Sequence, residues 1–474
     1  MYKNPEFFEQ LSALTKNVLP LIDPAIKRAF LPKQFDKYPN LEYSKTGFPQ
    51  ISNYPSRTNI FHFFHPPYQG KDPEINLKNF KEYEWLIANF TLTSKFSDYF
   101  RFPNRDIDQD ITYQFMAGRF IEEFIERYYY LYGEKYSTGK FSKVYLPVEN
   151  YLFADTIHFD IAIPILFLKF APNNFELSTG IYLRKISDED QRARYGISAY
   201  SPSIPDSLYM SATHELVLKD YTYKRPNTFY DYFHFSDPHI YPLAIVEKFI
   251  TILKLVTDET SGFAQLLVYP KNWAIRYNAD IKHIDGAVTK SYPHYFENFY
   301  WNRESFPEIT LIQLNEIKRL YNKSDLSPDN KVQISLKRLY KSMMRQEEED
   351  VIIDLIIALE LLLSDNEKND ISYKLSMRLT ALICKYNPQK YKKIEVFENI
   401  KKIYDFRSAV VHGSPKRAHK SREIKLADDS TIPTIELAKL YLREVLKIVI
   451  AEPKHLEAKT NDLLLLTSFN SKGK

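Results

Sequence analysis

Apolar residues in the last third of the chain recur with a helical period. In KVQISLKRLYKSMM (331–344) four apolar side chains lie three or four positions apart, which places them on one helix face. The segment EEEDVIIDLIIALELLLSD begins with acids and is then apolar on nearly all sides, so it predicts a central, buried helix. Similar patterns between residues 306 and 450 predict a bundle of five or six helices. These segments are FPEITLIQLNEIKRLYNK, DISYKLSMRLTALICKY, EVFENIKKIYDFRSAVVHG and TIPTIELAKLYLREVLKIVIAE.

Before residue 306 the hydrophobic pattern is mixed. YLFADTIHFDIAIPILFLKFA and FELSTGIYLRKIS combine alternation with β-branched and aromatic runs and predict strands. ITYQFMAGRFIEEFIERYYYLYG and PLAIVEKFITILKLVTD predict helices. We therefore predict an α+β N-terminal region followed by an all-α helical bundle. The expected parts are residues 1–305, with an internal boundary near 140, the bundle 306–455, and a C-terminal tail 456–474.

Length and composition fit this division. A chain of 474 residues exceeds one compact core, and 26% charged with 44% hydrophobic residues is typical of globular domains. The N-terminus lacks the apolar core of a secretion signal, and the longest apolar run, Val351–Leu363, is too short to span a bilayer. We expect a cytoplasmic protein with no membrane partner. The single cysteine, Cys384, excludes an internal disulfide and predicts a buried, inert thiol.

Charge is distributed unevenly, although the net charge is only +4. From Ile371 to Arg422 there are 13 Lys or Arg against 3 Asp or Glu, whereas Glu347–Asp370 holds 9 acids and one Lys. The basic residues at the end of the first stretch can neutralise phosphates. They can equally form a solvated basic loop. The candidate RNA-binding residues are Lys416, Arg417, Lys420 and Arg422.

The stretch YDFRSAVVHGSPKRAHK (404–420) carries the candidate chemistry. Arg407 and His412 lie five positions apart, roughly 140° around a helix, and the long arginine side chain can reach round toward the imidazole. Gly413 fits the first residue beyond a helix end and Pro415 a stop, so His412 falls in the last turn, where the helix dipole favours its protonated form. Such a histidine can exchange protons near neutral pH. Alternatively, both side chains only satisfy the last carbonyls of the helix.

Glu360 is a second polar residue in an apolar setting, within ALELLL. An unpaired carboxylate would be costly in a buried helix, so a basic partner is expected, with Arg378 or Arg407 as candidates. A structural ion pair is favoured over a catalytic role.

Three segments together resemble a known family. DLIIALELLL, YKLSMRLTALI and YDFRSAVVHG, in this order and spacing, resemble the Apea-like branch of the HEPN superfamily, whose signature is Arg, four residues, then His. The resemblance covers about 331–450, and LSTGIYLRKISDED and AIVEKFITILKLVTDETSGF are similar to regions that precede this domain. It implies a dimerising helical bundle and a metal-independent ribonuclease of a toxin or antiviral defence system. Arg407 and His412 match the motif, while Ser408 stands where active members more often carry Asn, Asp or His.

The implied reaction uses the 2′-OH of RNA as nucleophile. His412 would move the proton and Arg407 would hold the phosphate, with Ser408, Glu360 and Arg378 as supporting residues. Because each chain offers one such histidine, the resemblance implies a two-fold homodimer. The N-terminal region would then sense a protein or nucleic-acid trigger. The competing interpretation, which Ser408 favours, is a non-catalytic RNA- or nucleotide-binding dimerisation module.

Neither a metal nor a cofactor is predicted. His62 with His65, and His234 with His239, have spacings compatible with metal ligation, but no ordered set of carboxylates or cysteines accompanies them. The sequence also contains no phosphate-binding loop and no nucleophile elbow.

Overall fold

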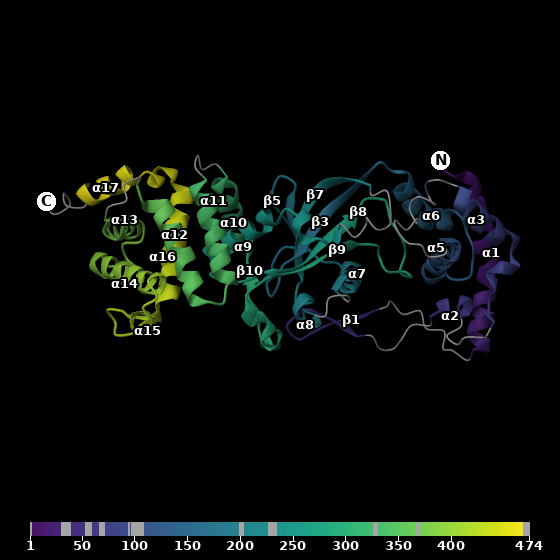
Figure 1. Ribbon diagram of the computed structural model, residues 1–474, viewed down its shortest axis with the longest axis horizontal. Helices are drawn as coiled ribbons and strands as arrows, with labels where there is room; N and C mark the ends of the chain where they lie inside the picture. The colour runs from purple at the N-terminus through teal and green to yellow at the C-terminus, as the bar shows by residue number, and fades with distance from the viewer. Residues whose placement is uncertain are drawn as a thin grey trace. The chain divides into compact units, whose positions relative to one another are not determined.

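The computed structural model describes most of the chain (Figure 1). The described residues are 2–29, 39–52, 59–65, 72–92, 95, 109–198, 203–225, 235–325, 330–365 and 370–467. They form two compact units, each assembled from three stretches of the chain. Unit 1 comprises Met1–Pro164, Gly180–Tyr241 and Ala264–Thr289, and unit 2 comprises Ile165–Thr179, Pro242–Phe263 and Lys290–Lys474.

A six-stranded antiparallel sheet occupies the middle of the chain, with strand order β5-β6-β7-β3-β8-β9. Strand β3 pairs with β7 on one side and β8 on the other. Its side chains first alternate between exposed and buried and then become fully buried, as expected of a central strand covered on both faces. The strands are β3 (Thr156–Pro164), β5 (Asn174–Ser178), β6 (Ile181–Lys185), β7 (His214–Lys224), β8 (Phe263–Pro270) and β9 (Asp285–Ser291).

Unit 1 also contains a group of mutually packed helices and a hairpin of β1 (Asn40–Tyr43) and β2 (Pro49–Ser52). The long helix α1 packs against α3, α5 and α6. Its first turn is capped by the side chain of Asn4, which accepts a hydrogen bond from the Phe7 N–H. The helices of unit 1 are α1 (Pro5–Arg28), α2 (Phe61–Phe64), η1 (Leu77–Asn79), α3 (Lys81–Leu92), α5 (Gln109–Tyr132), α6 (Thr138–Phe153), α7 (Asp188–Ser198), α8 (Asp206–Tyr209) and η3 (Pro238–Ile240).

Unit 2 is built around α12, which packs against α11, α13, α14 and α16 (Figure 1). Most of its apolar side chains are buried, so the prediction of a central helix here is confirmed. The helices of unit 2 are α9 (Leu243–Thr257), η4 (His294–Glu297), η5 (Tyr300–Asn302), α10 (Leu311–Ser324), α11 (Lys331–Met344), α12 (Glu348–Leu363), α13 (Ile371–Tyr386), α14 (Lys393–Val411), α15 (Pro415–Lys420), α16 (Thr434–Ala451), η6 (Pro453–Leu456) and α17 (Ala458–Thr467).

The predicted fold class, an α+β N-terminal region followed by an all-α bundle, is wrong. Helices and strands are mixed along the chain, and the large sheet lies in its middle after a mainly helical start. Unit 2 also contains strands, namely the antiparallel hairpin of β11 (Glu423–Lys425) and β12 (Thr431–Pro433) and the parallel pair of β4 (Lys169–Phe170) and β10 (Glu308–Ile309). The strands β10, β11 and β12 have only two or three residues, too few to show a period of two, so the sequence pattern missed them. Strand β4 lies within YLFADTIHFDIAIPILFLKFA, where strands were predicted.

The structure also tests the expectations for Cys384 and for membrane-spanning helices. Cys384 is buried on α13 as predicted, and burial raises the pKa of its thiol. No helix in the described ranges is long and apolar enough to cross a membrane.

Glycine positions in unit 1 allow a test of the packing. A Cβ at Gly286 of β9 would overlap the carbonyl oxygen of Leu266 on β8, whereas a Cβ at Gly196 of α7 would meet no atom within 4 Å. We predict that Gly286→Ala lowers the free energy of unfolding by about 1–3 kcal/mol through overpacking. Gly196→Ala, the matched control, should raise it by roughly 0.5–1 kcal/mol because alanine favours a helix. Denaturant unfolding measures both, and equal effects would contradict the packing of β9 on β8.

Candidate functional site

The C-terminal end of α14 positions the candidate residues. Gly413 has a positive φ of 61°, and its N–H donates to the Val410 carbonyl at 3.1 Å. The Ser414 N–H donates to the Ala409 carbonyl at 2.8 Å. These two bonds form a Schellman motif, so the prediction that Gly413 follows the helix end is confirmed. His412 is the C-cap residue, and Pro415 begins the short helix α15.

Arg407 and His412 lie on different sides of α14. Arg407 is half-buried, and its guanidinium carbon lies 5.7 Å from the ring centroid of Tyr404. His412 is exposed. Within the described part of the chain, the two side chains share no hydrogen bond, and His412 contacts no acidic side chain. Among the described residues, the guanidinium and the imidazole are therefore not in direct contact within one chain.

The Arg407 side chain has an unusual environment. Its Nε is buried and has no hydrogen-bond partner among the described residues, and no carboxylate lies within ion-pair distance of the guanidinium there. Burying an unpartnered N–H normally costs about 1–3 kcal/mol, more for a charged group. Among the described residues, the Arg407 guanidinium therefore has no carboxylate partner, and its Nε is shielded from solvent.

Glu360 meets Tyr404 rather than an arginine. The Tyr404 hydroxyl donates to Glu360 Oε1 at 3.1 Å. Burial raises the pKa of Tyr404, the Glu360 carboxylate raises it further, and Arg407 acts in the opposite direction. Tyr404 therefore lies between the carboxylate and the guanidinium.

Arg378 has a different role from the supporting one that the sequence suggested. Its guanidinium binds Asp462 at 2.7 and 2.9 Å, Asp365 at 2.7 Å and the Leu363 carbonyl at 3.1 Å. These bonds join α13 to the end of α12 and to α17. The hydrogen bond that Arg378 donates to Asp462 is the main cause that raises the pKa of Arg378. Arg378 is a structural clamp in unit 2.

The basic segment after α14 is only partly placed. Lys416 is exposed, and Ser408 is half-buried on α14. Arg422 Nε lies 3.2 Å from Glu348 Oε2, so this cation is already paired. The side chains of Arg417 and Lys420 lie outside the described residues.

No protein-family model, curated protein or solved structure matches the chain. The chemistry of the site therefore rests on the residues of α14 and their neighbours.

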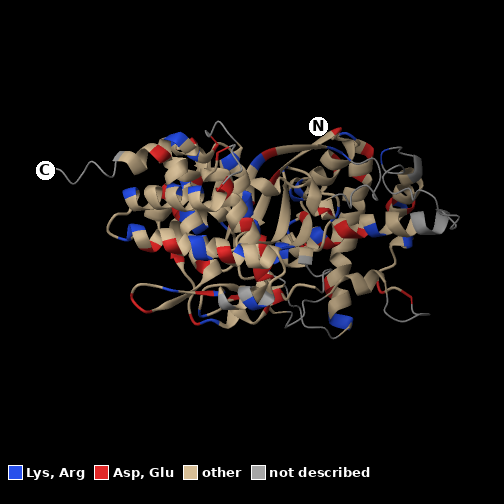
Figure 2. Cartoon of the chain, turned by 60° about the vertical axis from the view of Figure 1, so that its left-hand side comes forward, with Lys and Arg blue, Asp and Glu red and all other residues tan. Residues whose placement is uncertain are grey.

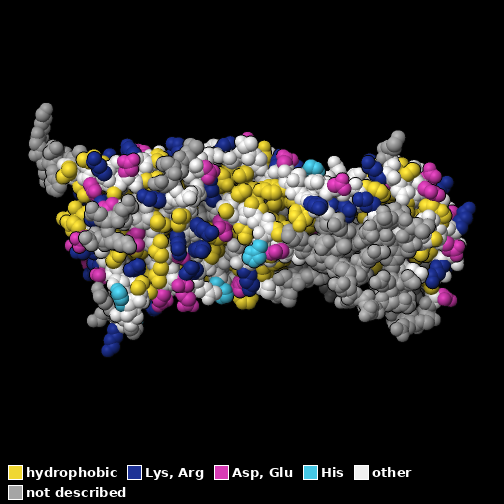
Figure 3. All heavy atoms as spheres, turned by 45° about the horizontal axis from the view of Figure 1, so that its top comes forward, with side chains coloured by type: hydrophobic (Ala, Val, Ile, Leu, Met, Phe, Trp, Pro, Cys, Tyr) yellow, Lys and Arg dark blue, Asp and Glu magenta, His cyan; other side chains and the backbone are white. Residues whose placement is uncertain are grey.

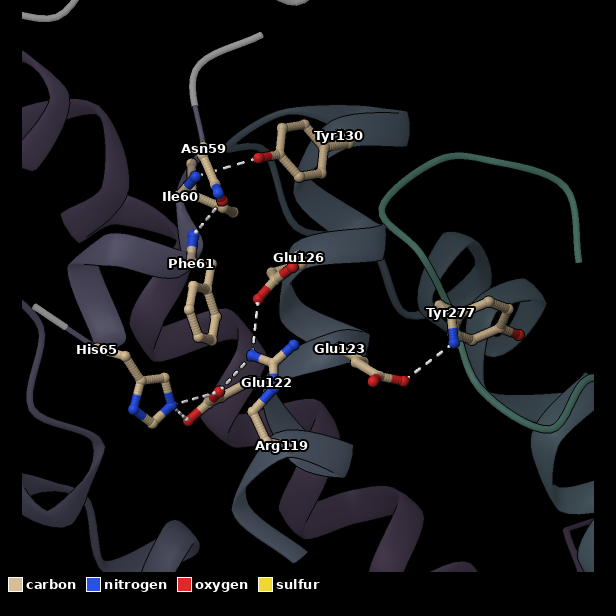
Figure 4. Close-up of polar contacts among 10 residues, drawn as sticks. All are labelled: Asn59, Ile60, Phe61, His65, Arg119, Glu122, Glu123, Glu126, Tyr130 and Tyr277. Carbon is tan, nitrogen blue, oxygen red and sulfur yellow. Dashed lines mark hydrogen bonds and ion pairs between the residues drawn. The ribbon is translucent and has the colours of Figure 1, made fainter. Parts of the chain in front are cut away.

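Sequence reasoning missed a polar cluster inside unit 1 (Figure 4). Arg119 of α5 lies between two buried carboxylates on the same helix, with Nη1 2.7 Å from Glu122 and 3.3 Å from Glu126. His65 Nε2 lies 2.8 Å from Glu122, and the guanidinium of Arg119 stacks 4.3 Å from the Phe61 ring. These contacts fasten the short helix α2 to α5. The signal was present in GRFIEEFIER, where charged residues interrupt an apolar helix.

Histidines that the sequence offered as metal ligands do not gather. His65 belongs to the cluster just described, His62 lies on α2, His239 is exposed on η3, and His234 lies outside the described residues. Over the described ranges, no group of three or more His, Cys, Asp or Glu side chains is arranged to hold a metal ion.

Glu123 gives unit 1 a pH-dependent stability. Its carboxylate accepts a hydrogen bond from the Tyr277 N–H at 3.0 Å (Figure 4), yet burial raises its pKa to about 7. The folded state therefore binds this proton more tightly than the unfolded state, so stability falls as pH rises from about 4.5 to about 7.

We predict that Glu123→Gln removes on the order of 2 kcal/mol of this pH dependence, because glutamine keeps the acceptor and carries no charge. Above pH 7 the variant should unfold at a higher temperature than the wild type, and near pH 5 the two should converge. Glu134→Gln removes an exposed carboxylate next to the same helix and is the control. Parallel melting curves for wild type and Glu123→Gln from pH 5 to pH 8 would contradict the assignment.

Proposed function

We propose that the protein is a metal-independent RNA endonuclease of the HEPN type, in which Arg407 and His412 act on the scissile phosphate. The observation that carries the proposal is the unpaired guanidinium of Arg407. Other arginines of unit 2 that lie in or beside α11 to α16 have carboxylate partners within the described residues. These pairs are Arg338–Asp354, Arg345–Asp350, Arg378–Asp462, Arg422–Glu348 and Arg443–Asp258.

A phosphate is the anion that suits this guanidinium. Arginine presents planar donors that match phosphate oxygens, and α14 leaves those donors without a competing carboxylate. An exposed histidine follows five residues later at the helix end. A cation and a proton carrier are the two groups that RNA cleavage by its own 2′-OH requires.

The proposed reaction conserves atoms and charge. A histidine accepts the 2′-OH proton as the O2′–P bond forms, and the P–O5′ bond breaks as a second histidine donates a proton to the leaving oxygen. The products are a 2′,3′-cyclic phosphate and a 5′-hydroxyl. Arg407 stabilises the extra negative charge on the pentacoordinate phosphorus.

Two histidines imply two chains. Arg407 and His412 lie on different sides of one α14 helix, so a site with both groups facing one phosphate needs a second copy in a two-fold dimer. Exposed apolar side chains on α13 and α14 support such a contact: Ile394 is 77% exposed, Tyr373 56% and Val411 48%. Large apolar side chains left in water favour association.

RNA would be held by local contacts rather than by a broad basic surface. Basic and acidic residues are interspersed along the ribbon in Figure 2, and their side chains are interspersed over the face that Figure 3 shows. Lys416 is exposed directly beyond the helix end that carries His412. The phosphates next to the cleaved one would meet this segment.

One observation favours the competing function, a non-catalytic RNA-binding dimerisation module. No side chain in the described ranges orients the His412 ring, and catalytic imidazoles are usually fixed by a hydrogen bond to the second nitrogen. In this alternative Arg407 holds a phosphate and no bond is cleaved.

We predict that His412→Ala and Arg407→Ala each reduce RNA cleavage at least 10²-fold, because they remove the proton carrier and the phosphate-binding cation. Cleavage of end-labelled single-stranded RNA by purified protein in EDTA measures the effect. His239→Ala removes an exposed histidine from unit 1 and should cleave like the wild type.

An RNA with a single 2′-deoxy residue at the cut site should resist cleavage there. Full activity of either α14 variant would eliminate the catalytic proposal, and RNA binding without cleavage by the wild type would favour the binding module.

A second prediction tests the shared site. If both His412 side chains of a dimer act on one phosphate, an equal mixture of wild type and His412→Ala should retain about a quarter of the activity of the same total amount of wild type, because only about one dimer in four keeps both histidines. The mixture is assayed after joint refolding or co-expression. About half of the wild-type activity, the value expected when each chain acts alone, would contradict the shared site.

A further inference from the structure

Unit 2 contains a pocket of about 620 Å³ that Phe406, on the buried face of α14, helps to line. It lies among η4, the end of α11, the first turns of α12 and α16, and the segment around Arg422. Its apolar lining includes Met343, Val351 and Phe406, which are buried, and the half-buried Ile435. The volume falls within the range of about 300–1,000 Å³ that is common for small-molecule sites.

Polar groups line the pocket in neutralised pairs. Arg422 pairs with Glu348 at 3.2 Å, and Lys439 Nζ lies 2.8 Å from Glu436 Oε1. Arg345 also lines the pocket, but its guanidinium is held by Asp350 at 2.9 Å and Asp354 at 3.0 Å. Because each cation has an acidic partner, the pocket does not select a highly charged anion.

Two amide side chains complete the lining. Asn298 and Gln346 are exposed at the pocket and make no side-chain hydrogen bond within the described part of the chain. Each amide offers one acceptor and two donor hydrogens. The pocket therefore combines an apolar surface with donors and acceptors side by side.

This combination fits a nucleobase. A base has flat apolar faces and an edge on which donors and acceptors alternate, and Arg, Glu, Asn and Gln are the side chains that pair with base edges. We propose that the pocket binds the base of one nucleotide of a single-stranded RNA. The Arg422–Glu348 pair would read its edge, with Met343, Val351 and Phe406 beneath its face.

The pocket and the candidate catalytic residues share helix α14 and the segment that follows it. Phe406 directly precedes Arg407, and Arg422 ends the basic segment that begins beyond His412. The inference rests on the proposed function for RNA as the source of the nucleotide. It adds a determinant of base preference to a site whose catalytic groups contact only phosphate and ribose.

The test measures binding of the four nucleoside 5′-monophosphates to the full chain by calorimetry, with ribose 5-phosphate as the probe that lacks a base. We expect at least one nucleotide to bind at least tenfold more tightly than ribose 5-phosphate. Ile435→Trp should reduce that affinity about tenfold or more by filling the pocket, and Glu348→Gln should change the order of preference among the bases. Glu349→Gln removes the neighbouring charge of the same helix turn outside the pocket and should bind within about twofold of the wild type.

The outcomes separate this inference from the proposed function. Base-dependent binding that is lost in Ile435→Trp supports the pocket, even if no RNA is ever cleaved. Equal affinity for all four nucleotides and ribose 5-phosphate, or unchanged affinity in both pocket variants, overturns the pocket whether or not His412→Ala abolishes cleavage. Thermal unfolding of each variant shows whether a lost affinity reflects the pocket or a misfolded chain, and a misfolded Ile435→Trp leaves Glu348→Gln to decide.

Discussion

A charge removed from water must meet an opposite charge or a full set of hydrogen bonds, and this constraint orders both units. In unit 1, Arg194 is completely buried and donates to the carbonyl oxygens of Tyr209, Met210 and Ala212 and to two glutamine side chains. Burial nevertheless lowers its pKa to about 10. Because these acceptors come from a loop, from α7 and from β8, one guanidinium fixes three segments that are distant in sequence.

Arg378 and Arg119 apply the same constraint elsewhere. The first joins α12, α13 and α17 in unit 2, and the second joins α5 to α2 in unit 1. Removing one partner from such a buried pair leaves the other charge uncompensated, which is far more costly than losing an exposed salt bridge. Arg407 differs from these arginines because it has no carboxylate partner among the described residues, whereas arginines on the neighbouring helices are paired.

Periodicity predicted the long elements of this chain and could not predict how they combine. The helices α11 to α14 and α16 and the strands β3, β5 and β6 follow from apolar spacing, and the end of α14 follows from Gly413. The fold class failed because helices and strands are mixed along the chain, and because β10, β11 and β12, in the part predicted to be all-α, are too short to show a period. The partner of Glu360 also escaped prediction, since Arg378 is held by Asp462, 84 residues away in sequence, and a hydroxyl on α14 takes its place. Such pairings depend on tertiary packing, which spacing along one helix does not contain.

The Glu360–Tyr404–Arg407 arrangement explains how an unpaired guanidinium can persist in the folded chain. A direct Glu360–Arg407 ion pair would satisfy the cation and would have to be broken before a phosphate could bind. Because Glu360 accepts from the Tyr404 hydroxyl and the guanidinium lies against the Tyr404 ring, the buried Nε of Arg407 keeps no competing acceptor in the described structure. In the pocket, by contrast, the cations already have acidic partners. The pocket therefore favours a ligand whose edge offers both hydrogen-bond donors and acceptors over a ligand that carries only charge. A nucleotide carries a charged phosphate and a neutral base. The unpaired guanidinium of Arg407 suits the phosphate, and the pocket with its paired cations suits the base.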